Sequence, residues 1–193
     1  MRYSAGHKEE TRRKIVGIAA KRFREQGVEG VGLASLMADA GLTHGGFYAH
    51  FSSKEELVKA AVQEALDQSL IRLARGAEKS GKRMESFVRS YLSPVHRDHP
   101  GEGCVVAALA AEIARHPADT KAELDLQVKA YVETFDRWLG GNNRSTAIAL
   151  YGLMSGTLQL ARACSDAAYS EQILASGVAA ALTLIKESSH EHS

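Results

Sequence analysis

The chain has 193 residues, 45% of them hydrophobic, and its 24 Lys and Arg against 23 Asp and Glu give a net charge of +1. This length suffices for one substantial core or for one small and one medium domain. The sequence contains no run of 18 apolar residues, so no membrane span is predicted. The first ten residues lack the apolar segment of a signal peptide, and two cysteines 60 positions apart predict reduced thiols in a cytoplasmic protein rather than a disulfide framework.

Charge is distributed unevenly along the chain. Residues 1–54 contain 9 Lys or Arg against 5 Asp or Glu, whereas residues 55–193 contain 15 against 18. A basic N-terminal part on an acidic remainder suits a protein that presents one end to a polyanion. A chance difference in composition would give the same charge distribution, so charge alone does not establish that this end binds a polyanion.

Residues 9–26 form the first predicted helix. Ile15, Ile18, Ala19 and Phe23 recur at helical spacing, and Gly27 ends the pattern. The basic residues of this helix are expected on its exposed face, namely Arg12, Arg13, Lys14, Lys21, Arg22 and Arg24.

A helix-turn-helix follows. Residues 33–40 read as a short amphipathic helix, and Gly41 can take the positive φ of a helix-ending turn. Thr43 is a candidate N-cap for a second short helix, and Ser53 is one for the long helix after it. Helix, tight turn and second short helix is the motif that places its second helix in a DNA major groove.

Across this motif the chain resembles the TetR-type transcriptional repressors. The residues that carry the resemblance are Gly41, Leu42, Thr43, Gly45, Phe47, Tyr48, His50, Phe51, Ser53, Lys54 and Leu57. It covers residues 8 to 57 and implies a repressor that binds double-stranded DNA at a palindromic operator. Where the family usually has Thr-Ser or Thr-Thr at the start of the second helix, this chain has Val31 and Gly32, so a side-chain phosphate contact is missing there.

Different kinds of DNA contact are expected from the recognition segment. Lys54, Tyr48 and His50 suit phosphate oxygens, whereas His44 can offer a ring N–H to a guanine acceptor. The predicted set also includes Thr43 and the pair Gly45 and Gly46, which leaves the backbone free to approach the bases but costs a short helix about 1 kcal/mol per glycine. Purely structural roles for Tyr48 and His50 stay open, and the aromatic rings of Phe47 and Phe51 are expected in the core.

The remainder predicts an all-α protein of about nine helices in two domains. A DNA-binding domain over residues 8–54 precedes a sensing and dimerisation domain over residues 55–188. Its helices are expected over 54–77, 83–92, 104–115, 119–139, 145–164 and 170–186, and residues 95–103 are expected to form a loop. The last two helices carry more apolar surface than one small bundle needs, and Gly152-x-x-x-Gly156 allows close approach, so they predict a homodimer.

The second domain is larger than DNA binding requires, which suggests a sensor for a small-molecule effector that releases the repressor. A pocket is expected among Tyr91, Cys104, Tyr131, Phe135, Trp138 and Met154. A filled core made of the same side chains is the alternative. A DNA-organising protein without an effector would have a sealed, pocket-free second domain.

Cys104 supports a second hypothesis, a redox- or electrophile-sensing repressor. It opens an apolar helix, where the helix dipole favours the thiolate, whereas Cys164 is expected to be buried at the end of a helix. His96, His99 and His116 lie near Cys104 in the sequence, but a His-x-x-His pair without a firm third ligand predicts no metal site. The sequence has no Gly-rich phosphate loop, nucleophile elbow or His-Glu-x-x-His motif, so neither an enzyme nor a cofactor is expected.

Overall fold

The computed structural model describes residues 5–77 and 83–190, and the elements assigned in these ranges are all helical. The all-α prediction is therefore confirmed. Nine α-helices and two 3₁₀ helices run in the order α1 (Ala5–Gln26), α2 (Leu33–Asp39), η1 (His44–Ala49), α3 (Lys54–Ala77), α4 (Arg83–Tyr91), α5 (Pro94–Asp98), η2 (Pro100–Glu102), α6 (Val105–Ile113), α7 (Ala118–Trp138), α8 (Arg144–Ala163) and α9 (Ala167–His190).

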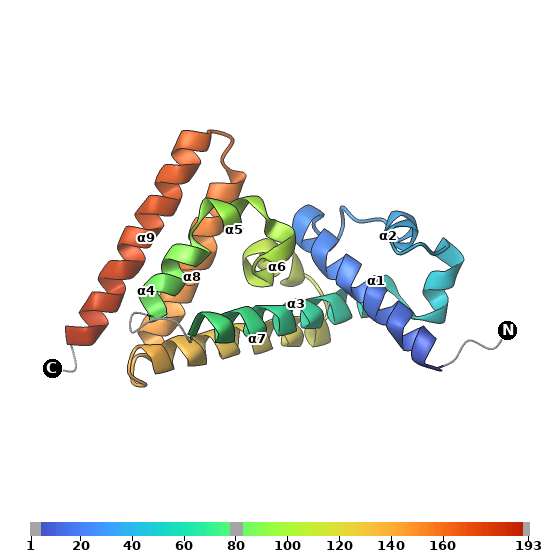
Figure 1. Ribbon diagram of the computed structural model, residues 1–193, viewed down its shortest axis with the longest axis horizontal. Helices are drawn as coiled ribbons and strands as arrows, with labels where there is room; N and C mark the ends of the chain where they lie inside the picture. The colour runs from blue at the N-terminus through green and yellow to red at the C-terminus, as the bar shows by residue number, and fades with distance from the viewer. Residues whose placement is uncertain (1–4, 78–82, 191–193) are drawn as a thin grey trace.

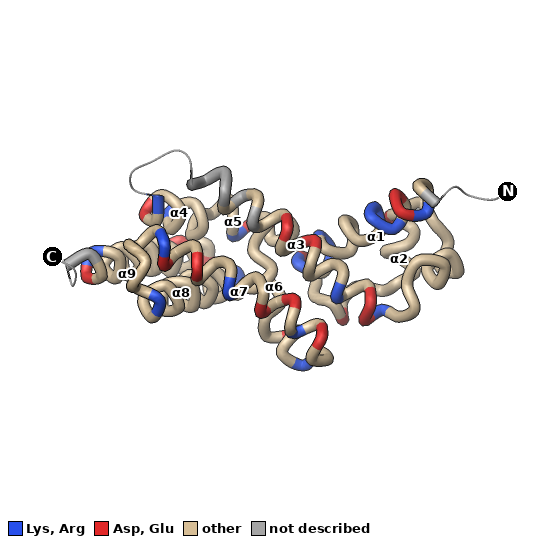
Figure 2. The backbone as a smooth tube through the Cα atoms, turned by 90° about the horizontal axis from the view of Figure 1, so that it is seen from below, with Lys and Arg blue, Asp and Glu red and all other residues tan. Residues whose placement is uncertain are grey.

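The molecule is elongated. Helices α1 and α2 lie at one end, α8 and α9 lie at the other, and α6 sits between them above the long helices α3 and α7 (Figure 1). The same separation is clear from below, where α1 and α2 lie far from α9 (Figure 2). We refer to α1, α2, η1 and the first half of α3 as the head.

Two clusters of buried apolar side chains hold the fold together. The first lies in the head and includes Ile15, Phe23 and Leu57, and the second is built mainly from α4, α7, α8 and α9. Helix α6 belongs to both clusters, because Val105, Leu109 and Ile113 pack in the first while Cys104 and Ala107 pack in the second. In α3, Ala65 still packs in the first cluster and Leu73 belongs to the second.

Several helix ends lie where the sequence places them. Gly27 and Gly41 take φ values of +76°, and Gly140 and Gly141 are also in the left-handed region, so each ends a helix as glycine does most easily. The predicted cap at Ser53 is formed, since its hydroxyl accepts the Glu56 N–H at 3.2 Å.

The recognition segment is the expected second short helix and has 3₁₀ geometry, in keeping with the low helix propensity of Gly45 and Gly46. One local prediction is wrong. Residues 95–103, expected as a loop, contain most of α5 and all of η2. The missed signal is Ser93-Pro94, because the Ser93 side chain accepts the His96 N–H at 3.2 Å and Pro94 occupies the first turn.

Helices α8 and α9 make a close hairpin at the end opposite the head. A Cβ on Gly177 would come within 2.4 Å of the Thr157 side chain, so this glycine permits the contact within the chain. A Cβ on Gly152 or Gly156 would meet open space instead, which leaves that stripe of α8 uncovered by the described residues.

Exposed apolar side chains are frequent on these two helices, and they include Ile148, Leu160 and Tyr169. Residues Ala167–Ser188 are the one stretch among the described residues long and apolar enough to cross a membrane. Length and composition alone make one such helix weak evidence for a membrane span.

Candidate DNA-binding face and effector cavity

The recognition segment is anchored from beneath by two phenylalanines. The rings of Phe47 and Phe51 are buried and stack with centroids 5.5 Å apart, as the sequence predicts. Tyr48 packs its ring edge-on against Phe47 yet is 65% exposed. His44 lies on the same exposed side, with its ring centroid 6.3 Å from that of Tyr48. Thus η1 presents a histidine and a tyrosine to solvent from a fixed base.

The backbone around these two rings is also accessible. Thr43 and Gly45 are exposed and Gly46 is half-buried, and no atom outside the immediate chain lies within 4 Å of a Cβ added to Gly45. Thr43 precedes η1 as its N-cap residue, but its side chain makes no capping hydrogen bond, so only its backbone carbonyl bonds the turn, to Gly46 N–H at 3.0 Å.

His50 and Lys54 lie at the edge of this face. Burial and then the charges of Lys8 and Arg12 lower the pKa of His50, so its ring is neutral at pH 7. Its Nδ1 atom is buried and has no hydrogen-bond partner among the described residues. Lys54 is half-buried in the first turn of α3, and a phosphate that approached both residues would meet a cation and an imidazole.

The start of α3 is held by a cluster around Glu56. Its carboxylate accepts the Ser52 N–H and hydroxyl, each at 2.8 Å, and Arg12 lies 3.4 Å away. These contacts, led by the Ser52 N–H, lower the pKa of Glu56. The Arg12 guanidinium also lies over the Phe51 ring, 4.7 Å from its centroid, and thereby joins α1 to the segment after η1.

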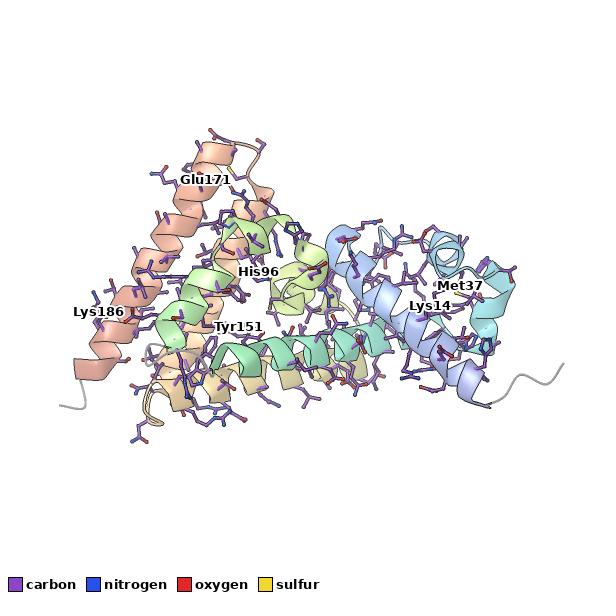
Figure 3. The ribbon with its side chains drawn as sticks, viewed as in Figure 1. Lys14, Met37, His96, Tyr151, Glu171 and Lys186 are labelled. Carbon is purple, nitrogen blue, oxygen red and sulfur yellow. The ribbon has the colours of Figure 1, made fainter. Side chains whose placement is uncertain are left out.

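The basic residues of α1 have more varied positions than the sequence predicts. Lys14 donates to the Ala40 carbonyl at 2.8 Å and Arg22 pairs with Asp39 at 2.6 Å, so both tie α1 to α2 (Figure 3 labels Lys14). Arg24, expected to be exposed, is 5% exposed. Its guanidinium instead donates to the Gly101 carbonyl in η2.

A cavity of about 750 Å³ opens among α4, α5, η2 and α7. Of the six residues predicted for an effector pocket, Tyr91, Cys104 and Tyr131 line it. The other three do not line it: Phe135 and Met154 are buried in the second core cluster, and Trp138 packs on that cluster against Phe87 and Phe135. The other lining residues are Ser86, Phe87, Ser90, Ser93, Val95, His96, His99, Glu102 and Gly103.

Polar atoms of Tyr151 and Gln127, which do not line this cavity, lie around the Cys104 thiol. The thiol of Cys104, 3% exposed, lies 3.4 Å from the Tyr151 hydroxyl and 3.8 Å from the Gln127 amide nitrogen. The Oε1 atom of Gln127 is buried without a partner among the described residues. Burial, reinforced by Cys104, raises the pKa of both Tyr91 and Tyr151, so both phenols are protonated donors.

His96 joins the cavity wall to the start of α6 (Figure 3). Its Nδ1–H donates to the Tyr91 carbonyl at 2.7 Å, and its Nε2 accepts the Cys104 N–H at 3.1 Å. These two bonds assign one neutral tautomer to the ring. Gly103 is required for this approach, because a Cβ there would lie 2.6 Å from Nε2.

The second cysteine and the third histidine lie outside this cavity. Cys164 is partly exposed at the end of α8, so its predicted burial is wrong: α8 ends there and the chain turns away instead of covering it. His116 pairs with Glu55 at 2.9 Å, away from His96 and His99. Within the described residues no three His, Cys, Asp or Glu side chains are grouped as metal ligands.

Three sets of polar contacts join the head to the segment from η2 to α7. Arg24 bonds Gly101 before α6. Near the other end of α6, Glu112 accepts the Val28 and Glu29 N–H groups at 3.0 and 2.9 Å. After α6, Glu55 accepts hydrogen bonds from His116 and Thr120. Helix α6 is therefore attached to the head on both sides.

Comparisons with known proteins agree with this arrangement. Residues 15–61 match the family described as bacterial regulatory proteins, tetR family. The chain is 25% identical over 136 residues to the uncharacterized HTH-type transcriptional regulator YfiR of Bacillus subtilis, covering 69% of this chain and 65% of YfiR. It is 39% identical over 70 residues to the HTH-type transcriptional regulator TtgR of Pseudomonas putida, covering 36% of this chain and 33% of TtgR.

The matched stretches thus span less than two thirds of the length of either regulator. Among solved structures, the reduced form of NemR from E. coli superposes with a TM-score of 0.75 at 21% identity, covering 89% of this chain and 95% of that one. That likeness establishes a shared fold.

Proposed function

We propose that the chain is a member of the TetR family of bacterial regulatory proteins, whose model matches residues 15–61, and that it is a cytoplasmic, sequence-specific DNA-binding regulator without enzymatic activity. Its expected action is that of a repressor which a small-molecule effector releases from the operator. The observation that carries the proposal is the exposed pair His44 and Tyr48 on η1, held by the buried rings of Phe47 and Phe51. Such a base lets a short helix enter a major groove without losing its position.

Contacts of two kinds are assigned to this face. His44 and the backbone at Gly45 and Gly46 read base edges, because His44 and Gly45 are exposed at the start of η1 and the two glycines carry no side chain. Thr43, Tyr48, His50 and Lys54 surround them and hold phosphates. The neutral ring of His50 serves as an N–H donor, whereas Lys54 contributes a charge.

A homodimer through α8 and α9 provides the second head. Ile148, Gly152, Gly156 and Leu160 follow one another at intervals of four residues on α8, and they form an apolar stripe with two open glycines. Such a stripe suits close packing against the same stripe of a second copy. Two heads would then read a palindromic operator in major grooves about 34–36 Å apart.

The cavity favours an effector without negative charge. Its walls are mainly aromatic and hydroxyl-bearing side chains, Glu102 is the carboxylate among them, and none of the described Lys or Arg side chains lines it. A polyanionic ligand would lack a counter-ion there. The lining phenols of Tyr91 and Tyr131 and the hydroxyls of Ser86, Ser90 and Ser93 can offer hydrogen bonds to a neutral, aromatic or aliphatic molecule with one polar group. A cavity of this size also disfavours a DNA-organising protein with a sealed second domain.

The route from cavity to head runs through α6. An effector that displaces His96 or Cys104 moves the start of α6, and the contacts of Gly101 with Arg24 and of Glu112 with Val28 pass this movement to α1. A shift of one head by a few ångströms removes the match to successive grooves.

Selection from random double-stranded DNA tests the proposal. The recovered sites should share a palindromic consensus, and purified protein should bind it more tightly than scrambled DNA at the same salt concentration. A variant carrying both His44→Ala and Tyr48→Ala should lose this preference while retaining its thermal stability, because both side chains are exposed. Equal affinity for consensus and scrambled DNA would remove the proposal.

A second candidate function, sensing of electrophiles by Cys104, is favoured by one observation. The Cys104 thiol lines the cavity and lies beside the Tyr151 hydroxyl, so an adduct would introduce bulk between α6 and α8. Treatment with a small α,β-unsaturated carbonyl compound should then release operator DNA from wild type and from Cys164→Ser, but not from Cys104→Ser. Release of the Cys104→Ser variant at the same reagent concentration would leave reversible effector binding as the only mechanism.

A further inference from the structure

A second cavity, of about 660 Å³, lies where α1, α5, α8 and the start of α9 meet. It shares no lining residue with the effector cavity. Its walls bring together residues far apart in the sequence: Arg24 from α1, Arg97 from α5, Arg162 from α8 and Ser170 from α9. The proposed DNA contacts on η1 take no part in it.

Three guanidinium groups line this cavity, against the two carboxylates of Glu25 and Asp98. Arg97 is already paired, since its Nε and Nη2 donate to Asp98 at 2.7 and 3.1 Å. Its Nη1 donates to the Ser170 hydroxyl at 3.0 Å, which orients the side chain toward α9. Asp98 is exposed, so this pair is accessible to a dissolved anion.

Arg162 differs from Arg97 in that carbonyl oxygens, rather than a carboxylate, accept its hydrogen bonds. Its Nε donates to the Arg97 carbonyl at 3.1 Å and its Nη2 to the His96 carbonyl at 2.7 Å. Its Nη1 is buried without a partner in the part of the chain that the structure describes. Burial lowers the pKa of Arg162, which is the sign expected of a cation removed from water.

A buried cation without a directly bonded counter-ion is costly, and carbonyl dipoles compensate it only in part. A guanidinium in this state has an unused N–H group that suits an oxyanion oxygen. The hydroxyl of Ser170 lies on the same wall, bonded to Arg97 and to the Ala161 carbonyl. Many of the remaining lining residues are alanines, such as Ala107 and Ala161, which leave room beside the arginines, and Gln159, Cys164 and Ser165 complete the walls with Pro100.

We propose that this cavity binds a small organic anion, whose phosphate or carboxylate group is held between Arg162 and Arg97. The anion enters beside the Arg97–Asp98 pair, and a small rotation of the Arg162 guanidinium exposes Nη1 to it. The site is independent of the proposed operator binding, and its occupant would bridge the α8–α9 turn and the α1 end of the head.

Inorganic phosphate and acetate are the probes, with chloride as the reference at constant ionic strength. Isothermal titration calorimetry and thermal unfolding of the full-length protein should show binding and stabilisation beyond chloride by at least one probe. Phosphate alone would identify a phosphate-bearing ligand, and acetate alone a carboxylate-bearing one. Stabilisation equal to that of chloride for both probes would overturn the proposal.

Substitutions in and outside the cavity test whether the anion binds there. Arg162→Gln and Arg97→Gln should each weaken binding about tenfold or more, the scale of one charge-assisted hydrogen bond, whereas Arg162→Lys should retain part of it. Arg115→Gln, an exposed arginine near the end of α6, and Lys54→Gln, on the proposed DNA face, should leave binding unchanged. Loss of binding in Lys54→Gln, or full binding in both cavity variants, would place the anion elsewhere.

Arg162→Gln removes two hydrogen bonds to α5 and can lower stability by itself. Hydrogen exchange on the wild-type protein therefore provides an independent measurement. The bound probe should slow exchange at the α8–α9 turn, residues 164–170, and in α5. Slower exchange confined to the head would contradict the assignment.

Discussion

Glu112 of α6 holds the backbone of Val28, just after the end of α1. Its carboxylate accepts the Val28 N–H at 3.0 Å and the following N–H, from Glu29, at 2.9 Å. These N–H groups follow Gly27, whose positive φ turns them toward the carboxylate. One side chain of α6 thereby satisfies two backbone donors at the end of α1.

Substitution of Glu112 tests this contact. Glu112→Gln keeps one acceptor oxygen but loses the charge, and it should lower the free energy of unfolding by about 1–3 kcal/mol. Hydrogen exchange at Val28 and Glu29 should accelerate. As a control, Glu102→Gln removes only an exposed carboxylate 4.0 Å from Lys21 and should change stability by about 0.5 kcal/mol or less. Unchanged exchange at Val28 would show that the carboxylate is dispensable.

Substitutions of Gly45 and Gly46 should change stability and DNA affinity in opposite directions. A Cβ at either position meets no atom closer than 3.6 Å, and neither residue has a positive φ. Gly45→Ala and Gly46→Ala should therefore each raise the free energy of unfolding by about 0.5–1 kcal/mol. If the backbone lies against base edges, operator binding should weaken by about 1 kcal/mol or more, the scale of one base contact. Thermal unfolding and fluorescence anisotropy measure both effects, and unweakened binding would contradict close approach.

His44 and Lys54 should respond differently to salt and to sequence. Lys54→Ala should weaken binding to all DNA sequences alike and reduce the slope of log affinity against log salt by about one unit. His44→Ala should instead change base preference at one position of each half-site, by about 1–3 kcal/mol. Equal effects of both substitutions on specific and random DNA would show that His44 is a phosphate contact.

His50 should make stability depend on pH. Its pKa in the folded chain lies below the ordinary value of 6.5, so below that pH the unfolded chain binds the proton more strongly. The contribution to stability is present above pH 6.5 and is lost as pH falls through the lowered pKa. Denaturant titrations from pH 5 to 7.5 give the free energy of unfolding at each pH. This free energy should rise less steeply with pH for His50→Gln than for wild type. An NMR titration that places the His50 pKa at or above 6.5 would contradict this.

The stripe on α8 predicts which substitutions make the protein monomeric. Ile148 and Leu160 are 54% and 64% exposed in the single chain. Glutamate at both positions should abolish the dimer, because two copies would bring like charges together across an apolar contact. Leu126→Glu, at an equally exposed position on α7, should leave the dimer intact. Sedimentation equilibrium distinguishes these outcomes, and a persistent dimer in the double variant would exclude this face.

Local signals explain what the sequence predicted well. The spacing of Ile15 and Phe23, the turn at Gly41 and the cap at Ser53 depend on neighbours within a few positions. The same reasoning places Phe47 and Phe51 in the core. Tyr91, Cys104 and Tyr131 line the predicted cavity, although whether it holds an effector stays a prediction.

Long-range partners explain what the sequence could not show. The Gly101 carbonyl that binds Arg24 is 77 residues away, and the Val28 N–H that Glu112 binds is 84 residues away. No periodic pattern distinguishes such an arginine or glutamate from an exposed one. Gln127 was missed for the same reason, since its role depends on Cys104 of a neighbouring helix.

Because α6 contributes side chains to both core clusters, the head should not be stable as a separate fragment without it. Val105, Leu109 and Ile113 complete the core of the head, so a fragment that stops within α3 would leave an apolar depression open to water. We expect such a fragment to aggregate, and chimaeras that exchange heads between relatives to need a matching α6. In the intact chain, loss of α6 would disrupt both cores at once, so head and second domain should melt together in a single calorimetric transition.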